Sequence, residues 1–79
     1  MAIKTVEMDS RDSVSYRGYL KKCGYISASY LSVSGFDASR LKKLAHEGKL
    51  DAVRCSIGNS VRWYYCEKQA ESAHLRGEV

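Results

Sequence analysis

The chain has 79 residues, enough for one small domain that buries roughly three-fifths of its unfolded surface on folding. Its 44% hydrophobic and 28% charged residues exclude a disordered chain, and no apolar run approaches membrane-spanning length. The net charge of +4 and the sequence pI near 9.1 favour polyanionic partners, although nine acidic residues dilute the excess.

The first segment, residues 1–12, has no clear hydrophobic period, and we expect a flexible N-terminal arm or a short edge strand there. From Ser13 the pattern becomes helical. Aromatic and apolar side chains recur at the spacing of one helix face: Tyr16, Tyr19, Leu20 and Cys23. Because Gly24 can adopt the left-handed conformation that ends a helix, we predict that the first helix stops there.

A second, short helix is predicted directly afterwards. Ser27 suits its N-cap because a serine hydroxyl accepts a hydrogen bond from the free amides of the first turn. The helix should run to about Ser34 and end at Gly35. Together with the next helix along the chain, it would form a helix-turn-helix unit whose turn contains glycine.

The third predicted helix, residues 38–47, is the most informative segment of the chain. Asp37 can cap its start, and Gly48 can end it. One side is an apolar stripe made by Ala38, Leu41, Leu44 and Ala45. The other side carries polar and basic residues: Ser39, Lys42, Lys43 and His46, with Arg40 projecting to one side. A short helix with a basic front fits the major groove of DNA, although a solvated core helix shows the same pattern.

After the third helix the period becomes alternating, and residues 50–66 are predicted to form a β-hairpin with a Gly-Asn-Ser turn. A two-residue turn would place Trp63 opposite Arg54, whereas a three-residue loop would place Trp63 opposite Cys55. Burial favours the three-residue loop because it gathers the apolar side chains on one face. The outer face would then hold Arg54, Ser56, Arg62 and Tyr64.

The last residues, 67–79, have a helix-favouring composition but only a weak apolar stripe. A short closing helix, a dimer contact and a frayed end are all compatible with this pattern.

Metal binding and catalysis find little support in the sequence. Three cysteines and two histidines are present, but Cys55 and Cys66 are far apart and Cys23 is distant from both. Structural zinc sites pair their ligands about two to four residues apart, so Cys23 and Cys55 better suit a core. No nucleophile elbow or glycine-rich phosphate loop occurs. We expect no metal, no cofactor and no enzymatic activity, and reduced thiols in a cytoplasmic protein.

The segment YLKKCGYISASYLSVSGFDASRLKKLAHEGKLDAV resembles the helix-turn-helix core of small bacterial and phage regulators. With the hairpin that follows, residues 13–66 resemble a winged helix-turn-helix DNA-binding domain. Residues 26–65 also resemble excisionase and MerR-type domains. The resemblance implies an α+β fold in which three short helices precede a two-stranded β-hairpin wing, with residues 67–79 as a C-terminal helix or tail.

By position, the resemblance implies that residues 38–47 are the recognition helix and that residues 50–66 are the wing. The DNA-contacting residues that it implies are Ser39, Arg40, Lys42, Lys43, His46, Arg54, Asn59, Ser60 and Arg62. We expect a sequence-specific double-stranded DNA-binding protein that regulates transcription or site-specific recombination in a bacterium, phage or plasmid. The alternative is a winged-helix module for protein–protein interaction in a larger phage or nucleoprotein assembly. The tail could contact a second copy or a partner protein.

Overall fold

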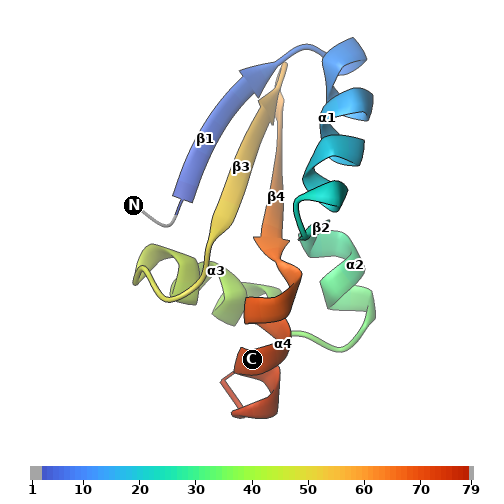
Figure 1. Cartoon of the computed structure of the whole chain (residues 1–79). Coiled ribbons are helices and arrows are strands. Elements are labelled where there is room, and N and C mark those ends of the chain that lie inside the picture. The colour runs from blue at the N-terminus through green and yellow to red at the C-terminus, as the bar shows by residue number, and fades with distance from the viewer. Residues whose placement is uncertain (1–2, 79) are drawn as a thin grey trace.

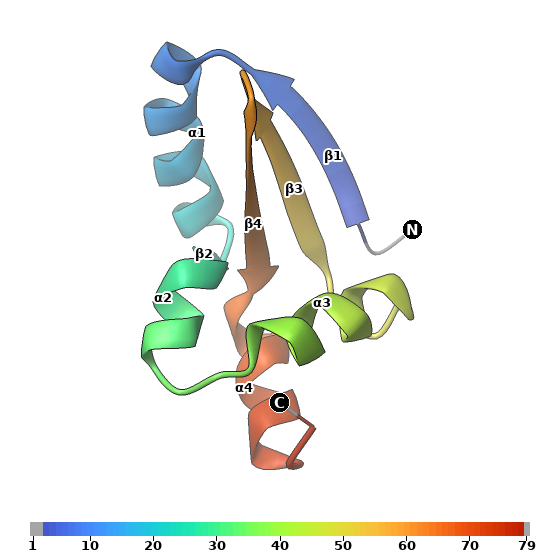
Figure 2. The same ribbon diagram turned by 180° about the vertical axis from the view of Figure 1, so that it is seen from behind.

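The computed structural model describes residues 3 to 78, which form four strands and four helices (Figure 1). In chain order the elements are β1 (Ile3–Met8), α1 (Ser10–Lys22), β2 (Tyr25–Ser27), α2 (Ala28–Val33), α3 (Ala38–His46), β3 (Ala52–Ile57), β4 (Ser60–Cys66) and α4 (Glu67–Leu75). The long strands β1, β3 and β4 lie side by side. α1 runs alongside them, and α3 lies near their lower ends in both views (Figures 1 and 2).

The strands make one mixed sheet in the order β1-β3-β4-β2. β1 is parallel to β3, β3 and β4 form an antiparallel hairpin, and β2 pairs with the C-terminal end of β4. This arrangement corrects the winged helix-turn-helix expected from the sequence, in which three helices precede a two-stranded hairpin. The chain is α+β, but one strand precedes the first helix and another separates the first two helices. The hairpin is flanked by β1 on one side and by the short β2 on the other, and it is not a free wing.

The strand β2 was not predicted, and the strand β1 was only one of two expectations for its region. β1 has six residues, and it pairs with a strand that is distant in the sequence, with Ile3 beside Ala52 and Met8 beside Ile57. β2 has only three residues. β2 is too short to reveal a period, and in β1 the apolar residues Ile3, Val6 and Met8 do not alternate regularly, so pairing in space decides both strands. For residues 3–8, the structure thus has the edge strand that was one of two expectations for this region.

Side-chain caps determine where the helices begin. The Asp9 carboxylate accepts hydrogen bonds from the amides of Arg11 and Asp12 at 2.9 and 3.0 Å, so α1 begins at Ser10, earlier than expected. The predicted N-caps of the next two helices are confirmed. The Ser27 hydroxyl accepts from the Tyr30 amide at 3.2 Å. Asp37 accepts from the amides of Ser39 and Arg40 at 3.0 and 3.2 Å.

The hairpin has a different register from the one that burial favoured. Ile57 pairs with Ser60 across a two-residue turn, so Trp63 lies opposite Arg54 and Tyr64 lies opposite Val53. The prediction assumed that only one face of the sheet is covered. Instead both faces of the sheet pack against helices. Apolar side chains are therefore required on each face, and alternation between an apolar and a polar face is not a guide to the register. Tyr64, which was expected to point to solvent, is 5% exposed.

Two small cores lie on the two faces of the sheet. The buried residues of the core beside α1 are Leu20, Val53, Cys55 and Tyr64. The core at the base of the other face, beside α2, α3 and α4, is made by Leu31, Leu41, Leu44, Ala45, Leu50, Ala52, Tyr65, Ala70 and Ala73. Cys55 is therefore a core residue as expected, but Cys23 is exposed at the end of α1.

The C-terminal residues form the helix α4, which buries Ala70 and Ala73. The Gln69 side chain joins α4 to the start of β3. Its oxygen accepts from the Asp51 amide at 2.6 Å, and its nitrogen donates to the Asp51 carboxylate at 3.0 Å. None of the helices in residues 3–78 is both long enough and apolar enough to cross a membrane.

Candidate nucleic-acid interface

The solvent side of α3 carries the helix residues that the sequence singled out. Leu41, Leu44 and Ala45 are buried and hold the helix against the core. The five residues proposed for DNA contact are all exposed: Ser39, Arg40, Lys42, Lys43 and His46. The helix phase deduced from the apolar stripe is thus confirmed for Leu41, Leu44 and Ala45 and for these five positions, whereas Ala38, the first residue of the stripe, is exposed.

Lys42 and His46 do not point straight to solvent but lean toward the sheet. The ammonium nitrogen of Lys42 lies 5.2 Å from the centre of the Trp63 ring, within the range of a cation–π contact. The His46 ring meets Trp63 edge-on, with the two ring centres 6.0 Å apart. Trp63 in turn stacks on Tyr65, with 6.2 Å between the ring centres. Trp63 therefore joins the exposed edge of α3 to the middle of the sheet.

Arg54 is the third basic residue in this region. It pairs with Trp63 in the β3–β4 register, and directly opposed residues project from the same face of a sheet. Trp63 and Arg54 are both half-buried. Lys42 and His46 thus contact one tryptophan ring, and Arg54 projects from the same face of the sheet as that ring. We call Lys42, Lys43, His46, Arg54 and Trp63 the α3–sheet surface.

Arg62, Asn59 and Ser60 are not part of the α3–sheet surface. Successive side chains of a strand alternate between faces, so Arg62 lies on the opposite face from its neighbour Trp63. There it lines a hollow together with Arg17 of α1. Asn59 and Ser60 are exposed at the hairpin turn, at the end of the sheet remote from α3 in both views (Figures 1 and 2). The expectation that Arg54 and Arg62 share an outer face is wrong because the turn has two residues instead of three.

Arg40 also lies apart from the other basic residues of α3. Its guanidinium nitrogen is 3.8 Å from the Asp37 carboxylate, which places it beside the start of the helix. At about 100° per residue, Arg40 and Lys42 project roughly 160° apart around the helix axis. One helix therefore carries two basic sides, and only the side with Lys42 adjoins the sheet.

The α3–sheet surface has an excess of positive charge. Within residues 3–78, no carboxylate lies within 4 Å of the charged nitrogens of Lys42, Lys43 or Arg54. Glu47, at the end of α3, is 4.0 Å from Lys49 instead. On the same sheet face Glu7 is paired with Ser56, farther toward the hairpin turn. The positive charge is thus concentrated at the α3 end of this face.

Two ionisable groups behind the surface have pKa values shifted by burial. Desolvation raises the pKa of Tyr65 to about 12 and raises that of the Cys55 thiol. Both groups therefore stay protonated at neutral pH, and they support the surface as packing residues. Within the described residues, no group of three or more His, Cys, Asp and Glu side chains could hold a metal ion.

Sequence reasoning turned Trp63 inward, and Trp63 does pack against the core, but its contacts with Lys42 and His46 were missed. The available signal was the spacing of Lys42 and His46, which lie four residues apart and so project from the same side of α3. A local pattern could not show what that side faces, because Trp63 is distant in the sequence and only the tertiary fold places it beside α3.

Comparisons with protein-family models, with curated proteins and with solved structures gave no match to this chain. The resemblance to winged helix-turn-helix proteins therefore stays an expectation from the sequence.

Proposed function

We propose that the protein binds double-stranded DNA through the α3–sheet surface. The observation that carries this proposal is that Lys42 lies over Trp63, and half-buried Arg54 pairs with Trp63 in the sheet. Exposed Lys43 follows Lys42 on α3, and within residues 3–78 none of the three has a carboxylate partner. Unpaired cations on an exposed helix and the adjoining sheet provide favourable contacts for phosphates. In this proposal α3 enters the major groove, which is wide enough to admit a helix.

The residues divide between two roles. Lys43 and Arg54 would neutralise phosphates, which supplies affinity without sequence selection. Ser39 and His46, both exposed on α3, would meet base edges, where hydrogen-bonding side chains distinguish sequences. Lys42, held against Trp63, would contact a phosphate at the edge of the groove. The biological role that we propose is regulation of transcription or site-specific recombination, in the cytoplasm.

Salt dependence is the first test of this mechanism. If about three phosphates are neutralised, affinity should fall roughly fortyfold between about 50 and 200 mM monovalent salt, because counterions are released on binding. Fluorescence anisotropy with a labelled random duplex measures this slope. An affinity that does not change over this range would contradict phosphate neutralisation as the source of binding.

A charge reversal tests the surface itself. Lys43→Glu should weaken duplex binding at least about tenfold, because it removes one phosphate contact and adds a repulsive charge. Lys22→Glu is the matched control, since Lys22 is exposed in the last turn of α1, on a different helix. Both variants should keep their stability within about 0.5 kcal/mol, as exposed substitutions usually do.

The same two variants also distinguish DNA binding from the alternative, a protein-interaction module. If Lys43→Glu and Lys22→Glu bind duplex DNA equally well, α3 does not contact DNA. If neither the natural chain nor the variants bind duplex DNA at low salt, the DNA proposal fails and the protein-interaction module becomes the better account.

A further inference from the structure

The strand β4 has an open edge next to β2. The register between β2 and β4 ends at the pair Ser27 and Tyr64. Beyond that pair, residues 60–63 of β4 pair with β3 on one side, and no strand of the described chain pairs with them on the other. Strands with an open edge can accept a further strand from another chain.

The main-chain groups at this edge can be assigned. The Cys66 amide donates to the Asp51 carbonyl at 3.0 Å, which directs it to the β3 side. Main-chain groups of alternate residues in a strand point to opposite edges. Those of Val61 and Trp63 therefore point to the open edge. Val61 is 45% exposed.

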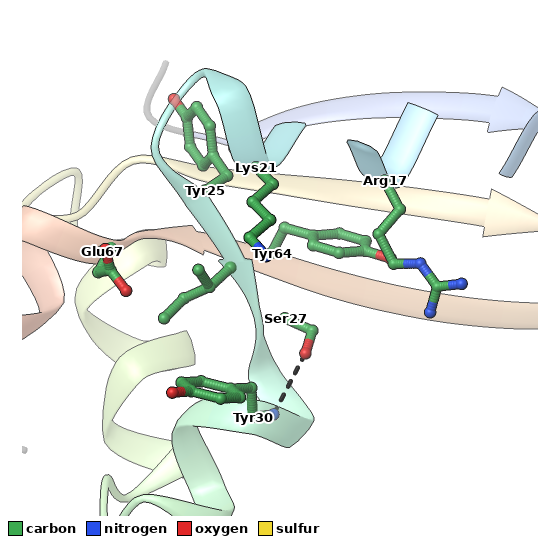
Figure 3. A pocket seen from close by; sticks show the side chains of 8 residues that line it. Arg17, Lys21, Tyr25, Ser27, Tyr30, Tyr64 and Glu67 are labelled. Carbon is green, nitrogen blue, oxygen red and sulfur yellow. Dashed lines mark hydrogen bonds between the residues drawn. The ribbon is translucent and has the colours of Figure 1, made fainter. Parts of the chain in front are cut away.

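Three hollows gather along the open edge. One of about 350 Å³ lies between the start of α2 and residues 60–64. Another of about 270 Å³ is lined by Arg17 and Lys21 from α1, by Tyr30 from α2, and by Tyr64 (Figure 3). A smaller hollow of about 80 Å³ lies between α1 and Arg62. Tyr64 lines all three, so we treat them as one groove, the β4-edge groove.

The charges of the groove are mainly positive. Its basic residues are Arg17, Lys21 and Arg62, and within residues 3–78 none of them has a carboxylate within 4 Å. The only carboxylate among the residues that line the three hollows is that of Glu67. In Figure 3 Glu67 lies away from Arg17, at the other end of the hollow.

We propose that the β4-edge groove binds an extended acidic segment of another protein by strand addition. Main-chain hydrogen bonds to residues 60–63 would supply affinity, and alternate side chains would supply selectivity. On one face the segment would place acidic side chains beside Arg62 and Arg17. On the other face it would place apolar side chains beside Val61. The preferred segment therefore alternates acidic and apolar residues.

A second copy of this chain fits the groove less well. An antiparallel pairing of two β4 edges would bring Arg62 and Arg17 of both copies onto one face of the joined sheet. Like charges across neighbouring strands are destabilising. An acidic partner, in contrast, gains charge-assisted contacts from the same residues. The positive groove therefore favours a partner of opposite charge.

The β4-edge groove is distinct from the α3–sheet surface. Arg62 and Arg17 lie on the sheet face opposite to Arg54, which belongs to the proposed DNA contact. The two proposals can therefore fail independently. Lys43→Glu should leave peptide binding unchanged, and Arg62→Glu should leave duplex binding largely unchanged.

The test uses the full chain and a synthetic peptide of about eight residues that alternates valine with glutamate. In ¹⁵N–¹H spectra the peptide should shift the amides of Val61 and Trp63, and it should slow their hydrogen exchange. A peptide that alternates valine with lysine should bind at least about tenfold more weakly. A third peptide, with proline at alternate positions, lacks the main-chain donors and should not bind.

Two variants test separately the positive charge of the groove and the open edge of β4. Arg62→Glu should lose about tenfold or more in affinity for the glutamate peptide and gain affinity for the lysine peptide. Val61→Pro removes an edge donor without breaking the β3 ladder, so it should abolish binding of the glutamate peptide. Lys22→Glu is the control for both and should bind the glutamate peptide normally. Circular dichroism confirms that each variant is folded.

Three results would overturn the proposal. One is equal affinity of the glutamate and lysine peptides for the natural chain. Another is a set of shifted amides confined to α3, which would place the peptide on the other surface. The third is a concentration-dependent dimer of the natural chain in analytical ultracentrifugation that Val61→Pro abolishes, which would assign the edge to a second copy.

Discussion

The ammonium group of Lys42 lies 5.2 Å from the centre of the Trp63 ring, so a charge carried by α3 is held against the middle of the sheet. This contact joins two elements whose residues belong to separate segments of the chain. It also gives the α3–sheet surface an intrinsic reporter, because Trp63 is the only tryptophan in the sequence.

The first prediction concerns this contact. Lys42→Ala should lower the free energy of unfolding by roughly 0.5–1 kcal/mol, the usual size of an exposed cation–π pair. The tryptophan emission should also shift to longer wavelength, because the Trp63 ring becomes more exposed to water. Urea titration followed by fluorescence measures both effects. Lys43→Ala is the control, because within residues 3–78 Lys43 does not lie over an aromatic ring, and an equal effect there would show that the Trp63 contact contributes nothing.

A second prediction tests the packing of α3. Leu41 is 0% exposed, so Leu41→Ala should lower the free energy of unfolding by about 2–5 kcal/mol through lost burial and a cavity. Leu75 is 87% exposed, and Leu75→Ala should change stability by less than about 0.5 kcal/mol. Chemical denaturation compares the two. Similar losses in both variants would mean that α3 does not pack as described.

The third prediction is a loss of stability at alkaline pH. Burial raises the pKa of Tyr65 to about 12, from about 10 for an exposed tyrosine. The folded state therefore holds this proton more tightly than the unfolded state does. The resulting stability is fully present below about pH 10 and is lost as the pH rises toward 12. At about 1.4 kcal/mol per pKa unit, the loss reaches about 3 kcal/mol.

Tyr65→Phe isolates this effect, because phenylalanine keeps the ring and removes the ionisable group. Burial also raises the pKa of Tyr16 and Tyr25, so both proteins should lose some stability above pH 10. The natural chain should lose more than the variant, as measured by urea titration at several pH values. Identical pH profiles would show that Tyr65 ionises like an exposed tyrosine.

The fourth prediction ranks the three cysteines by reactivity. Cys23 is exposed, Cys66 is half-buried and Cys55 is buried with a raised pKa. Because the thiolate is the reactive form, Cys23 should react first with an aromatic disulfide reagent and Cys55 last. Mass spectrometry after timed labelling identifies each site. Cys55 should react only at the rate of unfolding, and labelling as fast as that of Cys23 would contradict its place in the core.

Much of the local structure follows from the sequence alone. Asp37 and Ser27 cap their helices as expected, because a side-chain oxygen and the amides it satisfies lie within a few residues of each other. The apolar stripe of residues 38–45 correctly gives the buried side of α3 at Leu41, Leu44 and Ala45, since helical spacing alone decides which side chains share a face. The exposed positions Lys42 and His46 follow from the same geometry.

The tertiary structure decided the rest. Whether β1 forms a strand depends on its pairing with β3, and the hairpin register depends on whether one or both faces of the sheet are covered. Neither the pairing of β1 nor the covering of both faces can be deduced from a local hydrophobic period, because a strand is stabilised by its neighbours in space. The observed hairpin register differs by one residue from the predicted one. This difference places Arg62 and Arg54 on opposite faces of the sheet and places Trp63 on the face beside Lys42. The sequence by itself thus determined that the polar and basic residues of α3 reach solvent. Only the packing of the sheet determined which of the other charges lie beside them.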